Sequence, residues 1–416
     1  MPEPYDVITM GRIGVDLYPL EVGVPLARVE TFGKFLGGSP TNVAVAAARL
    51  GRRTAVITRT GQDAFGTYLH QELERFGVDA RWATAVAEYP TPVTFCEIFP
   101  PDNFPLYFYR QPKAPDLEIH ASDLDLDAVR AARIFWMTGT GLSAEPSRSA
   151  TLAALAARGT GPADASGATT ATVFDLDWRP MFWDGGDDST EAPARYREAL
   201  AHATVAVGNV EECRIATGER EPYAAARALL AAGVELAVVK QGPKGVLAVH
   251  RDGTSADCPP LPVEVVNGLG AGDAFGGALC HGLLAGWPLD RLVRYANAAG
   301  AIVASRLACS SAMPFPGEVE RAVEAGAVTA EPGARAAQAD LSTPVGPGAA
   351  PDLGAQAARE ARQAPPAPST PPDPSTPPDP GAPADPSAPA TRQAPPDPGA
   401  SAAPNTPAAP RTGADS

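Results

Sequence analysis

Short apolar runs alternate with amphipathic segments along the chain up to about residue 326. The apolar runs predict buried strands, and the amphipathic segments predict helices between them. The predicted strands span residues 5–10, 54–60, 133–137, 172–177, 204–208, 235–240 and 246–251. The predicted helices span residues 43–50, 64–76, 145–157, 273–284 and 289–306, with a short one near 318–324. Because strands that alternate with helices form a parallel sheet covered on both faces, the pattern predicts an α/β fold.

Two segments depart from this alternation. Residues 17–36 are strand-like but are broken by Pro19, Pro25 and several glycines, which is typical of a projecting flap rather than a core element. Residues 91–99 and 106–110 predict a second pair of strands around a turn. We expect the flap and this strand pair to form a small sheet that stands apart from the main one.

A glycine-rich stretch follows a valine-rich run at residues 263–266, which itself predicts a strand. Gly268, Gly270 and Gly272 allow a sharp turn in which backbone N–H groups converge, and the helix that follows adds partial positive charge. Such a site suits a phosphate, and Asp273 beside it could take a proton from an attacking hydroxyl. The alternative is a glycine-rich turn with Asp273 as the N-cap, and the stretch alone does not decide between them.

A second glycine pair, Gly37 and Gly38, precedes the first predicted helix. Ser39 followed by Pro40 is a common helix start, with the serine as N-cap and the proline in the first helical position. Gly51 then ends that helix.

Charge and cysteine usage narrow the classes of partner. The formal net charge of −15 at pH 7 argues against nucleic acid or an anionic membrane. The five cysteines are scattered without a C-x-x-C pair, which suits a reducing cytosol and argues against a disulfide framework or a zinc site. The N-terminus has no signal-peptide pattern, and no apolar run is long enough to span a bilayer. We therefore expect a cytoplasmic protein.

Beyond residue 326 the composition changes to Pro, Ala, Ser, Thr and Asp, and Ser-Thr-Pro-Pro-Asp-Pro repeats at Ser369 and Ser375. Such a segment cannot bury enough apolar surface to offset its ordering entropy. We predict one domain over residues 1–326 and a disordered tail over 327–416. A solubilising appendage is favoured over a partner-docking arm. The composition of residues 159–168 predicts a surface loop.

Four separated motifs together resemble the ribokinase, or PfkB, family of carbohydrate kinases. They are Asp16 after Gly11-x-x-Gly, Gly37-Gly38-x-x-x-Asn42, Asn209-Val-Glu-Glu212 and Gly270-Ala-Gly-Asp273. The resemblance covers about residues 5–324 and implies a three-layer α/β/α sandwich with a mostly parallel sheet and a lid over residues 12–36 and 91–112. The sequence contains no Walker-type phosphate loop, and the late glycine stretch lacks the spacing of a dinucleotide fingerprint.

The resemblance also implies roles for individual residues. Asp273 resembles the catalytic base, and the backbone N–H groups of Gly270, Ala271 and Gly272 resemble the anion hole. The implied sugar-side residues are Asp16, Gly37, Gly38 and Asn42. The implied nucleotide-side residues are Asn209, Glu212, Lys240, Gly242, Gly245 and Asn297, with Glu212 holding Mg²⁺ indirectly through water. Ordinary roles stay open for each: a turn residue at Asp16, a first-turn helix residue at Asn42, a capped turn at Asn209 and Glu212, and a surface amide at Asn297.

Three further stretches resemble the family members that act on the sugar acid 5-dehydro-2-deoxy-D-gluconate in inositol catabolism. They are residues 31–42, 107–116 and 175–183. The resemblance implies phosphorylation of that acid's terminal hydroxyl with ATP and Mg²⁺. Arg12, Lys34, Arg110 and Arg179 fall in segments around the sugar, and a guanidinium can grip a carboxylate bidentately; the sequence does not decide which one does. Alternatives are a kinase for 2-dehydro-3-deoxygluconate, fructose or ribose, or a non-catalytic sugar-binding protein.

One departure concerns a monovalent cation. Many family members have Asp-Thr-Thr before the Gly-Ala-Gly-Asp motif, where the aspartate helps to form a monovalent-cation site. This chain has Asn267, Gly268 and Leu269 there. We therefore expect weak activation by K⁺. The family resemblance also makes the lid a candidate homodimer surface.

Overall fold

The computed structural model describes residues 3–159 and 170–328. Its main sheet has nine strands in the order β13-β12-β11-β10-β9-β8-β1-β4-β5. In that order the strands are Ser255–Cys258, Val246–His250, Leu236–Lys240, Val205–Asn209, Ala171–Asp175, Ile134–Thr138, Val7–Met10, Thr54–Gly61 and Val78–Val86. The seven strands from β11 to β5 are parallel, whereas β12 and β13 run antiparallel to their neighbours.

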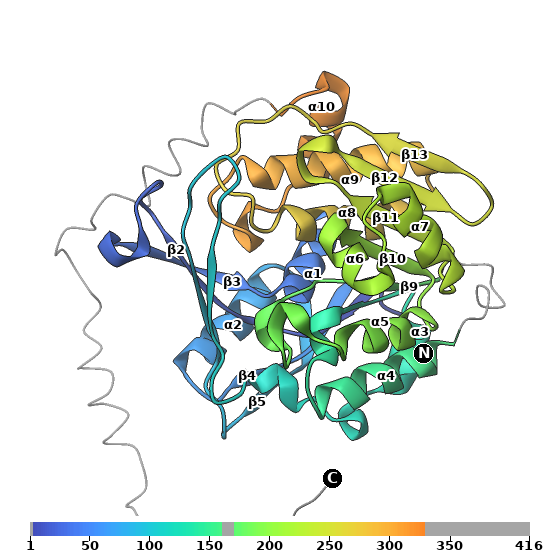
Figure 1. The fold of residues 1–416 in the computed structure, drawn as a ribbon. Helices are drawn as coiled ribbons and strands as arrows, with labels where there is room; N and C mark the ends of the chain where they lie inside the picture. Colours follow the sequence, from blue (N-terminus) through green and yellow to red (C-terminus); the bar gives the residue numbers. More distant parts are fainter. Residues whose placement is uncertain (1–2, 160–169, 329–416) are drawn as a thin grey trace, which may run out of the picture. The chain divides into compact units, whose positions relative to one another are not determined.

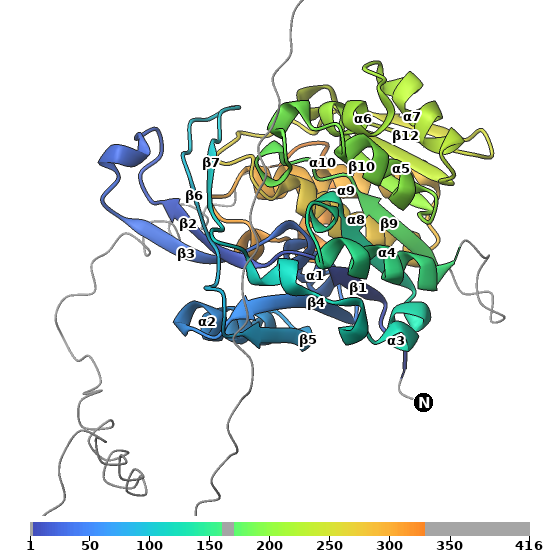
Figure 2. The same ribbon diagram turned by 60° about the horizontal axis from the view of Figure 1, so that its bottom comes forward.

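Helices cover both faces of this sheet (Figures 1 and 2). One face packs against α1 (Ser39–Arg49), α2 (Ala64–Arg75), α8 (Ala271–Leu284), α9 (Leu289–Ala304) and α10 (Pro316–Ala325). The other packs against α3 (Leu126–Ala131), α4 (Ser147–Arg158), α5 (Ala192–Leu200), α6 (Val210–Thr217) and α7 (Pro222–Ala231). Along β1, Val7 enters the first core and Ile8 the second, as expected for a strand buried on both faces. The predicted three-layer α/β/α sandwich is confirmed.

A four-stranded sheet, named the lid sheet here, stands to one side of the main sheet (Figure 1). Its order is β3 (Phe32–Gly37), β2 (Gly14–Pro19), β6 (Val93–Cys96) and β7 (Leu106–Tyr109). Asp16 pairs with Phe35 on one side and Thr94 on the other, so these three side chains share a face. Lys34 pairs with Leu17 and therefore lies on the opposite face.

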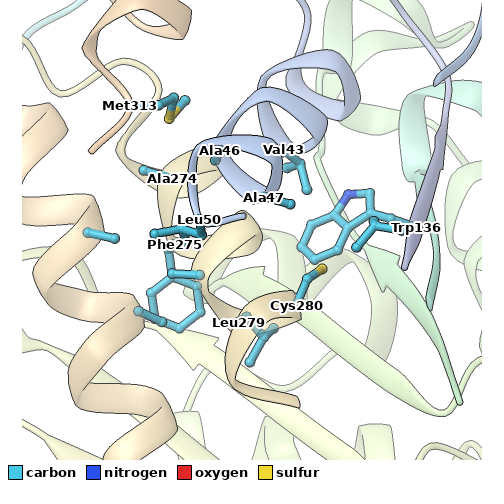
Figure 3. Packing of buried hydrophobic residues seen from close by; sticks show 14 of the residues in the cluster. Val43, Ala46, Ala47, Leu50, Trp136, Ala274, Phe275, Leu279, Cys280 and Met313 are labelled. Atoms are coloured by element: carbon cyan, nitrogen blue, oxygen red, sulfur yellow. The ribbon is translucent and has the colours of Figure 1, made fainter. Parts of the chain in front are cut away.

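Helices α1 and α8 pack closely against each other beside Trp136 of β8 (Figure 3). A Cβ atom on Gly277 would overlap the Ala46 side chain, and one on Gly276 would lie 2.7 Å from the Trp136 ring. The two glycines after Phe275 therefore allow the helices to approach. This packing brings the first turn of α8 beside the first turn of α1, where Ser39 Oγ donates to Asp273 over 2.7 Å.

Several predicted elements differ from the structure. Residues 263–266 form no strand, because the prolines just before them lack the N–H groups of a ladder and Val266 donates instead to the Ala304 carbonyl. Ser39 is not the N-cap of α1, since the helix begins at Ser39 with Gly38 as N-cap. Strands β5 and β13 were not predicted. Most of the predicted loop at 159–168 and nearly all of the predicted tail lie outside the described residues.

Candidate active site

A cavity of about 420 Å³ lies at the carboxyl ends of the central strands. Asp175, Asn209 and Lys240 are the last residues of β9, β10 and β11, and all three line it. In parallel sheets this edge is the usual position of a ligand site. Asp16 and Thr94 line the cavity from the lid sheet. The cavity thus lies between the end of the main sheet and the lid.

Asp273 lies in the first turn of α8 and lines this cavity. Ser39 Oγ donates to its Oδ1 over 2.7 Å, and Asn42 Nδ2 donates to its Oδ2 over 2.9 Å. Burial raises the pKa of Asp273 above its ordinary value, although both hydrogen bonds oppose the rise. The carboxylate is therefore held in one orientation and kept basic, as general-base chemistry requires.

The amino end of α8 presents backbone N–H groups beside Asp273. Its N-cap, Gly270, has a φ of 80° and supplies no side-chain cap, so the N–H groups of the first turn are left for a ligand. A Cβ on Gly272 would lie 3.3 Å from Lys240 Nζ, which places that amine against the same turn. Burial alone would lower the pKa of Lys240, but nearby carboxylates, Asp175 foremost, raise it above the usual value. Lys240 is therefore a cation at an anion-binding helix end.

Asp16 lines the cavity beside the glycine pair that precedes α1. A Cβ on Gly37 would overlap the Asp16 carboxyl group, so glycine is needed at this position. Tyr18 Oη donates to Asp16 Oδ2 over 2.9 Å and lies 2.8 Å from Cys309 Sγ. Burial raises the pKa of Asp16 to about 7. Asp16 is thus an acceptor whose charge changes near neutral pH.

Two buried groups, Arg12 and Asp177, line the cavity as an ion pair. Arg12 was one of the candidates for binding the carboxylate, whereas Asp177 was not predicted as a site residue. Arg12 also donates to Thr140 Oγ1 over 2.7 Å, and Arg179 Nη2 lies 3.1 Å from Asp177 Oδ1. Asp177 has a φ of 38°, which is uncommon outside glycine. Burial would raise the pKa of Asp177, but the two arginines outweigh it and lower that pKa. A fixed charge network thus holds Arg179 at the cavity wall.

Asp175 is a further cavity carboxyl group that sequence reasoning missed. Burial raises its pKa to about 8, although Lys240 acts in the opposite direction. Its position as the last residue of β9 was the available signal, because polar residues at the carboxyl ends of parallel strands converge. Arg12 lies two residues after the end of β1, but its pairing with Asp177 depends on the order of the strands.

Asn209 and Glu212 both line the cavity and also form a capping box. Asn209 Oδ1 accepts from the Glu212 N–H over 2.9 Å, and Glu212 Oε2 accepts from the Asn209 N–H over 2.7 Å. The capped turn that the sequence left open is therefore present. The other carboxylate oxygen, Glu212 Oε1, lies 3.6 Å from Arg179 Nη1. Among the described residues no group of three or more acidic, His or Cys side chains could hold a metal. Mg²⁺ commonly takes only one or two carboxylates plus substrate phosphates and water, so Glu212 and Asp175 fit such a site.

Arg110 follows β7 and lines the cavity, with Nη2 donating to Asp116 Oδ2 over 2.7 Å. Its guanidinium lies 4.9 Å from the centre of the Phe182 ring. Asn42 lines the cavity too, and its Oδ1 is buried without a partner among the described residues. Both side chains therefore keep polar capacity for a ligand.

Of the predicted site residues, most line the cavity: Asp16, Gly38, Asn42, Arg110, Arg179, Asn209, Glu212, Lys240, Gly242, Gly270, Gly272 and Asp273. Five do not: Lys34, Gly37, Gly245, Ala271 and Asn297. Gly37 supports Asp16, and Ala271 can contribute its backbone only.

The structure does not bring Lys34 or Asn297 to the cavity. Lys34 is exposed on the outer face of the lid sheet, where its Nζ lies 3.8 Å from the centre of the Tyr68 ring. Strand alternation is the reason, because Asp16 and its partner Phe35 occupy the inner face. Asn297 donates to the Pro259 carbonyl over 2.9 Å and is thereby tied to the end of β13. Gly245, with a φ of 98°, shapes the turn before β12.

Fold and site together define a class: an α/β phosphotransferase with a basic anion site, a buried carboxylate and a lid. The chain belongs to the pfkB family of carbohydrate kinases, whose profile matches residues 5–316. The 5-dehydro-2-deoxygluconokinase of Geobacillus kaustophilus is 33% identical over 328 residues, which are 77% of this chain and 94% of that protein. The protein of the same name from Clostridium tetani is 31% identical over 328 residues, with the same shares.

Two solved sugar-kinase structures are also similar to this chain. A sugar kinase from Pyrococcus horikoshii in complex with ATP is 26% identical, with a TM-score of 0.62, and the match covers 76% of this chain and 99% of that one. A fructokinase variant from Vibrio cholerae, with fructose, ADP and a potassium ion bound, is 25% identical with a TM-score of 0.64. That match covers 78% of this chain and 100% of the fructokinase.

Proposed function

We propose that this protein is an ATP-dependent kinase that phosphorylates the terminal hydroxyl of 5-dehydro-2-deoxy-D-gluconate. One observation carries the proposal: Asp273 is held by Ser39 and Asn42 beside the uncapped amino end of α8, within a lid-covered cavity. The curated relatives with this activity in their names, matched over 94% of their length, support the choice of sugar acid.

In the proposed reaction Asp273 accepts the proton of the sugar acid's terminal hydroxyl while the hydroxyl oxygen attacks the γ-phosphorus of ATP. The phosphoryl group then moves to that oxygen, and ADP leaves. The N–H groups at the start of α8 and the Lys240 ammonium stabilise negative charge on the transferring group. They are positioned before the reaction, so little reorganisation is needed when charge develops.

ATP and Mg²⁺ are the cofactors in this proposal. Mg²⁺ would neutralise phosphate charge, with Glu212 and Asp175 as the carboxylates that fit it, directly or through water. Asn209 fixes Glu212 through the capping box. The binding of ATP or ADP by solved relatives that are at least 25% identical supports the nucleotide assignment.

Recognition of the sugar acid's carboxylate falls to arginines in this proposal. The overall charge of −15 makes long-range attraction of an anion unfavourable, so local cations must supply it. Arg12 is already committed to Asp177 and Thr140, and Lys34 lies on the outer face of the lid sheet. Arg110 and Arg179 line the cavity, and Arg179 Nε is buried without a partner among the described residues.

The lid sheet has two faces with different proposed roles. Its inner face covers the sugar and excludes water, which would otherwise hydrolyse ATP. Its outer face carries a row of aromatic rings, with Phe95 5.5 Å from both Phe32 and Tyr109, and Tyr109 is 64% exposed. We propose that a second copy covers this row, and a monomeric mass in sedimentation equilibrium would contradict it.

The domain organisation and the location are proposals as well. Residues 1–326 would form the catalytic domain, with 327–416 as an appendage. No helix among residues 3–159 and 170–328 is long and apolar enough to cross a membrane. Five cysteines that form no disulfide support a reducing cytoplasm.

A substrate panel tests the proposed activity. ADP release is measured with 5-dehydro-2-deoxygluconate, 2-dehydro-3-deoxygluconate, fructose and ribose, each with Mg²⁺ and ATP. We expect the highest kcat/KM for the first acid. Equal or faster turnover of fructose would contradict the substrate assignment, and sugar binding without ADP release would contradict the kinase assignment.

A further inference from the structure

Asn267 lies directly before the glycine loop at the amino end of α8 and is fully buried. Its backbone N–H donates to the Ala304 carbonyl over 3.1 Å, and Val266 donates to the same carbonyl over 2.8 Å. Ala304 is the last residue of α9. The start of the phosphate-binding loop is therefore tied to the end of α9.

The Asn267 side chain extends this link in two directions. Its Nδ2 donates to the Leu307 carbonyl over 2.6 Å, and its Oδ1 accepts from the Leu269 N–H over 3.0 Å. The Leu269 N–H can only donate and the Leu307 carbonyl can only accept. The position therefore needs one donor and one acceptor in the same side chain, which an amide provides.

The loop held in this way is the one that forms the anion site. Between Asn267 and α8 lie only Gly268, Leu269 and Gly270. A Cβ on Gly268 would lie 2.9 Å from the Phe104 ring, and one on Gly270 would lie 2.7 Å from Cys309 Sγ. The loop is thus packed from both sides, and the amide fixes its first residues against the segment that follows α9.

A carboxylate in place of this amide would require a counter-ion. Aspartate has nearly the same size but, when ionised, only acceptors, so one oxygen would face the Leu307 carbonyl oxygen. A buried charge without a partner is strongly unfavourable unless a proton or a bound cation neutralises it. The Asn267 N–H₂ group already satisfies that carbonyl, and the neutral amide supplies no charge to hold K⁺. The donor set at Asn267 therefore does not fit a monovalent cation such as the potassium ion present in the solved Vibrio cholerae fructokinase variant.

We propose that Asn267 takes the place of a monovalent cation: it is a positioning residue that holds the phosphate-binding loop by hydrogen bonds, so that the enzyme works without K⁺. The catalytic part of this inference rests on the proposed kinase function. The structural part, that the loop is held without an ion, does not.

The test compares full-length wild type with three variants in KCl and in choline chloride of equal ionic strength. Asn267→Asp introduces the carboxylate, Asn267→Ala removes both side-chain bonds, and Gln71→Glu makes the same amide-to-acid change at an exposed site on α2. Unfolding temperature and sugar-acid kinetics are measured for each. The unfolding temperature is a readout that does not depend on turnover.

For wild type and Gln71→Glu we expect the same unfolding temperature in both salts, within about 1 °C, and the same kcat within about twofold. Asn267→Asp should unfold at least about 3 °C higher in KCl than in choline, and its kcat should rise at least about tenfold with K⁺. Asn267→Ala should lose at least about tenfold in kcat in both salts, because its loop is no longer positioned.

Tenfold activation of the wild type by K⁺ would overturn the inference, and so would an Asn267→Asp variant with no salt-specific response. If Asn267→Asp fails to fold in either salt, an Asn267→Ala variant with wild-type kcat overturns it instead, whereas the expected loss supports it. If no tested sugar is phosphorylated, the proposed function fails, while the unfolding temperatures still decide whether the loop needs an ion.

Discussion

At the scale of single residues, the site contains buried charged side chains, which are unfavourable unless neighbouring groups stabilise their charge. Asp273 keeps its orientation through Ser39 and Asn42, and these two bonds partly offset the effect of burial on its pKa. Ser39 was predicted as a helix cap, and its hydroxyl instead donates to the Asp273 carboxylate. A hydroxyl near a helix start has both options, and only the position of α8 decides between them.

The raised pKa of Asp16 predicts a pH dependence. Burial raises that pKa to about 7, so the carboxylate is largely protonated below pH 7 and available as an acceptor above it. We expect kcat/KM for the sugar acid to fall as the pH decreases through about 7. Below that pH, a plot of log(kcat/KM) against pH should have a slope near one. In Asp16→Asn this limb should disappear at a lower overall rate. A variant that keeps the limb would show that another group titrates there.

Contacts between residues that are distant in the sequence could not be predicted at this scale. Arg12 and Asp177 are 165 residues apart in the sequence, and their ion pair depends on β8 lying between β1 and β9 in the sheet. The motif residues Asp16, Asn42 and Asp273 were predicted to share a site because their motifs together resemble those of the carbohydrate-kinase family, whereas a turn or a helix start alone left ordinary roles open. Their common cavity agrees with that prediction, but their individual roles stay predictions.

At the scale of elements, the sequence pattern predicted the strands that are buried on both faces and was wrong where prolines interrupt an apolar run. The alternation of strands and helices predicted the α/β layers because each central strand is apolar on both faces. The valine-rich run at 263–266 failed as a strand because prolines precede it and its N–H groups bond to α9. Strand β13 was missed because only four residues, Ser255–Cys258, alternate between exposed and buried positions.

The positions of Arg110 and Lys34 on the lid predict different effects of their substitution. Arg110 lines the cavity, whereas Lys34 lies on the outer face, so of these two residues we expect only Arg110 to meet the substrate carboxylate. Arg110→Ala should raise KM for the sugar acid at least about tenfold, as expected for a lost hydrogen bond to a charged group. Lys34→Ala should stay within about twofold, as for most surface substitutions.

The readout for this pair is the ratio of kcat/KM for the sugar acid to kcat/KM for fructose. The ratio is independent of the amount of folded enzyme, which matters because Arg110→Ala leaves Asp116 without its ion pair. An equal loss on both sugars would assign Arg110 to the fold rather than to the carboxylate.

At the scale of the whole molecule, the catalytic fold accounts for only part of the chain. The matched region is 77% of this chain but 94% of the relatives from Geobacillus kaustophilus and Clostridium tetani. The change in composition after residue 326 predicts a domain boundary there. The order of the nine strands was not predictable in the same way, because the pattern gives the elements but not their neighbours.

The boundary predicts the effect of a truncation. A chain that ends at Val328 keeps every described element, including the bond from the Val328 N–H to the Pro262 carbonyl at 3.1 Å. We expect its kcat and KM to stay within about twofold of the full chain, because every described element is kept. A loss above tenfold with an unchanged unfolding temperature would give residues 329–416 a direct role.

The central claim is that Asp273 activates a sugar hydroxyl beside the anion site of α8. It is tested most directly by ADP release from 5-dehydro-2-deoxygluconate in wild type and Asp273→Asn, with sugar binding measured by calorimetry on the same samples. We expect Asp273→Asn to lose about 10²–10⁴-fold in kcat, while it still folds and binds the sugar acid. Turnover by Asp273→Asn at a rate close to that of wild type would contradict the account.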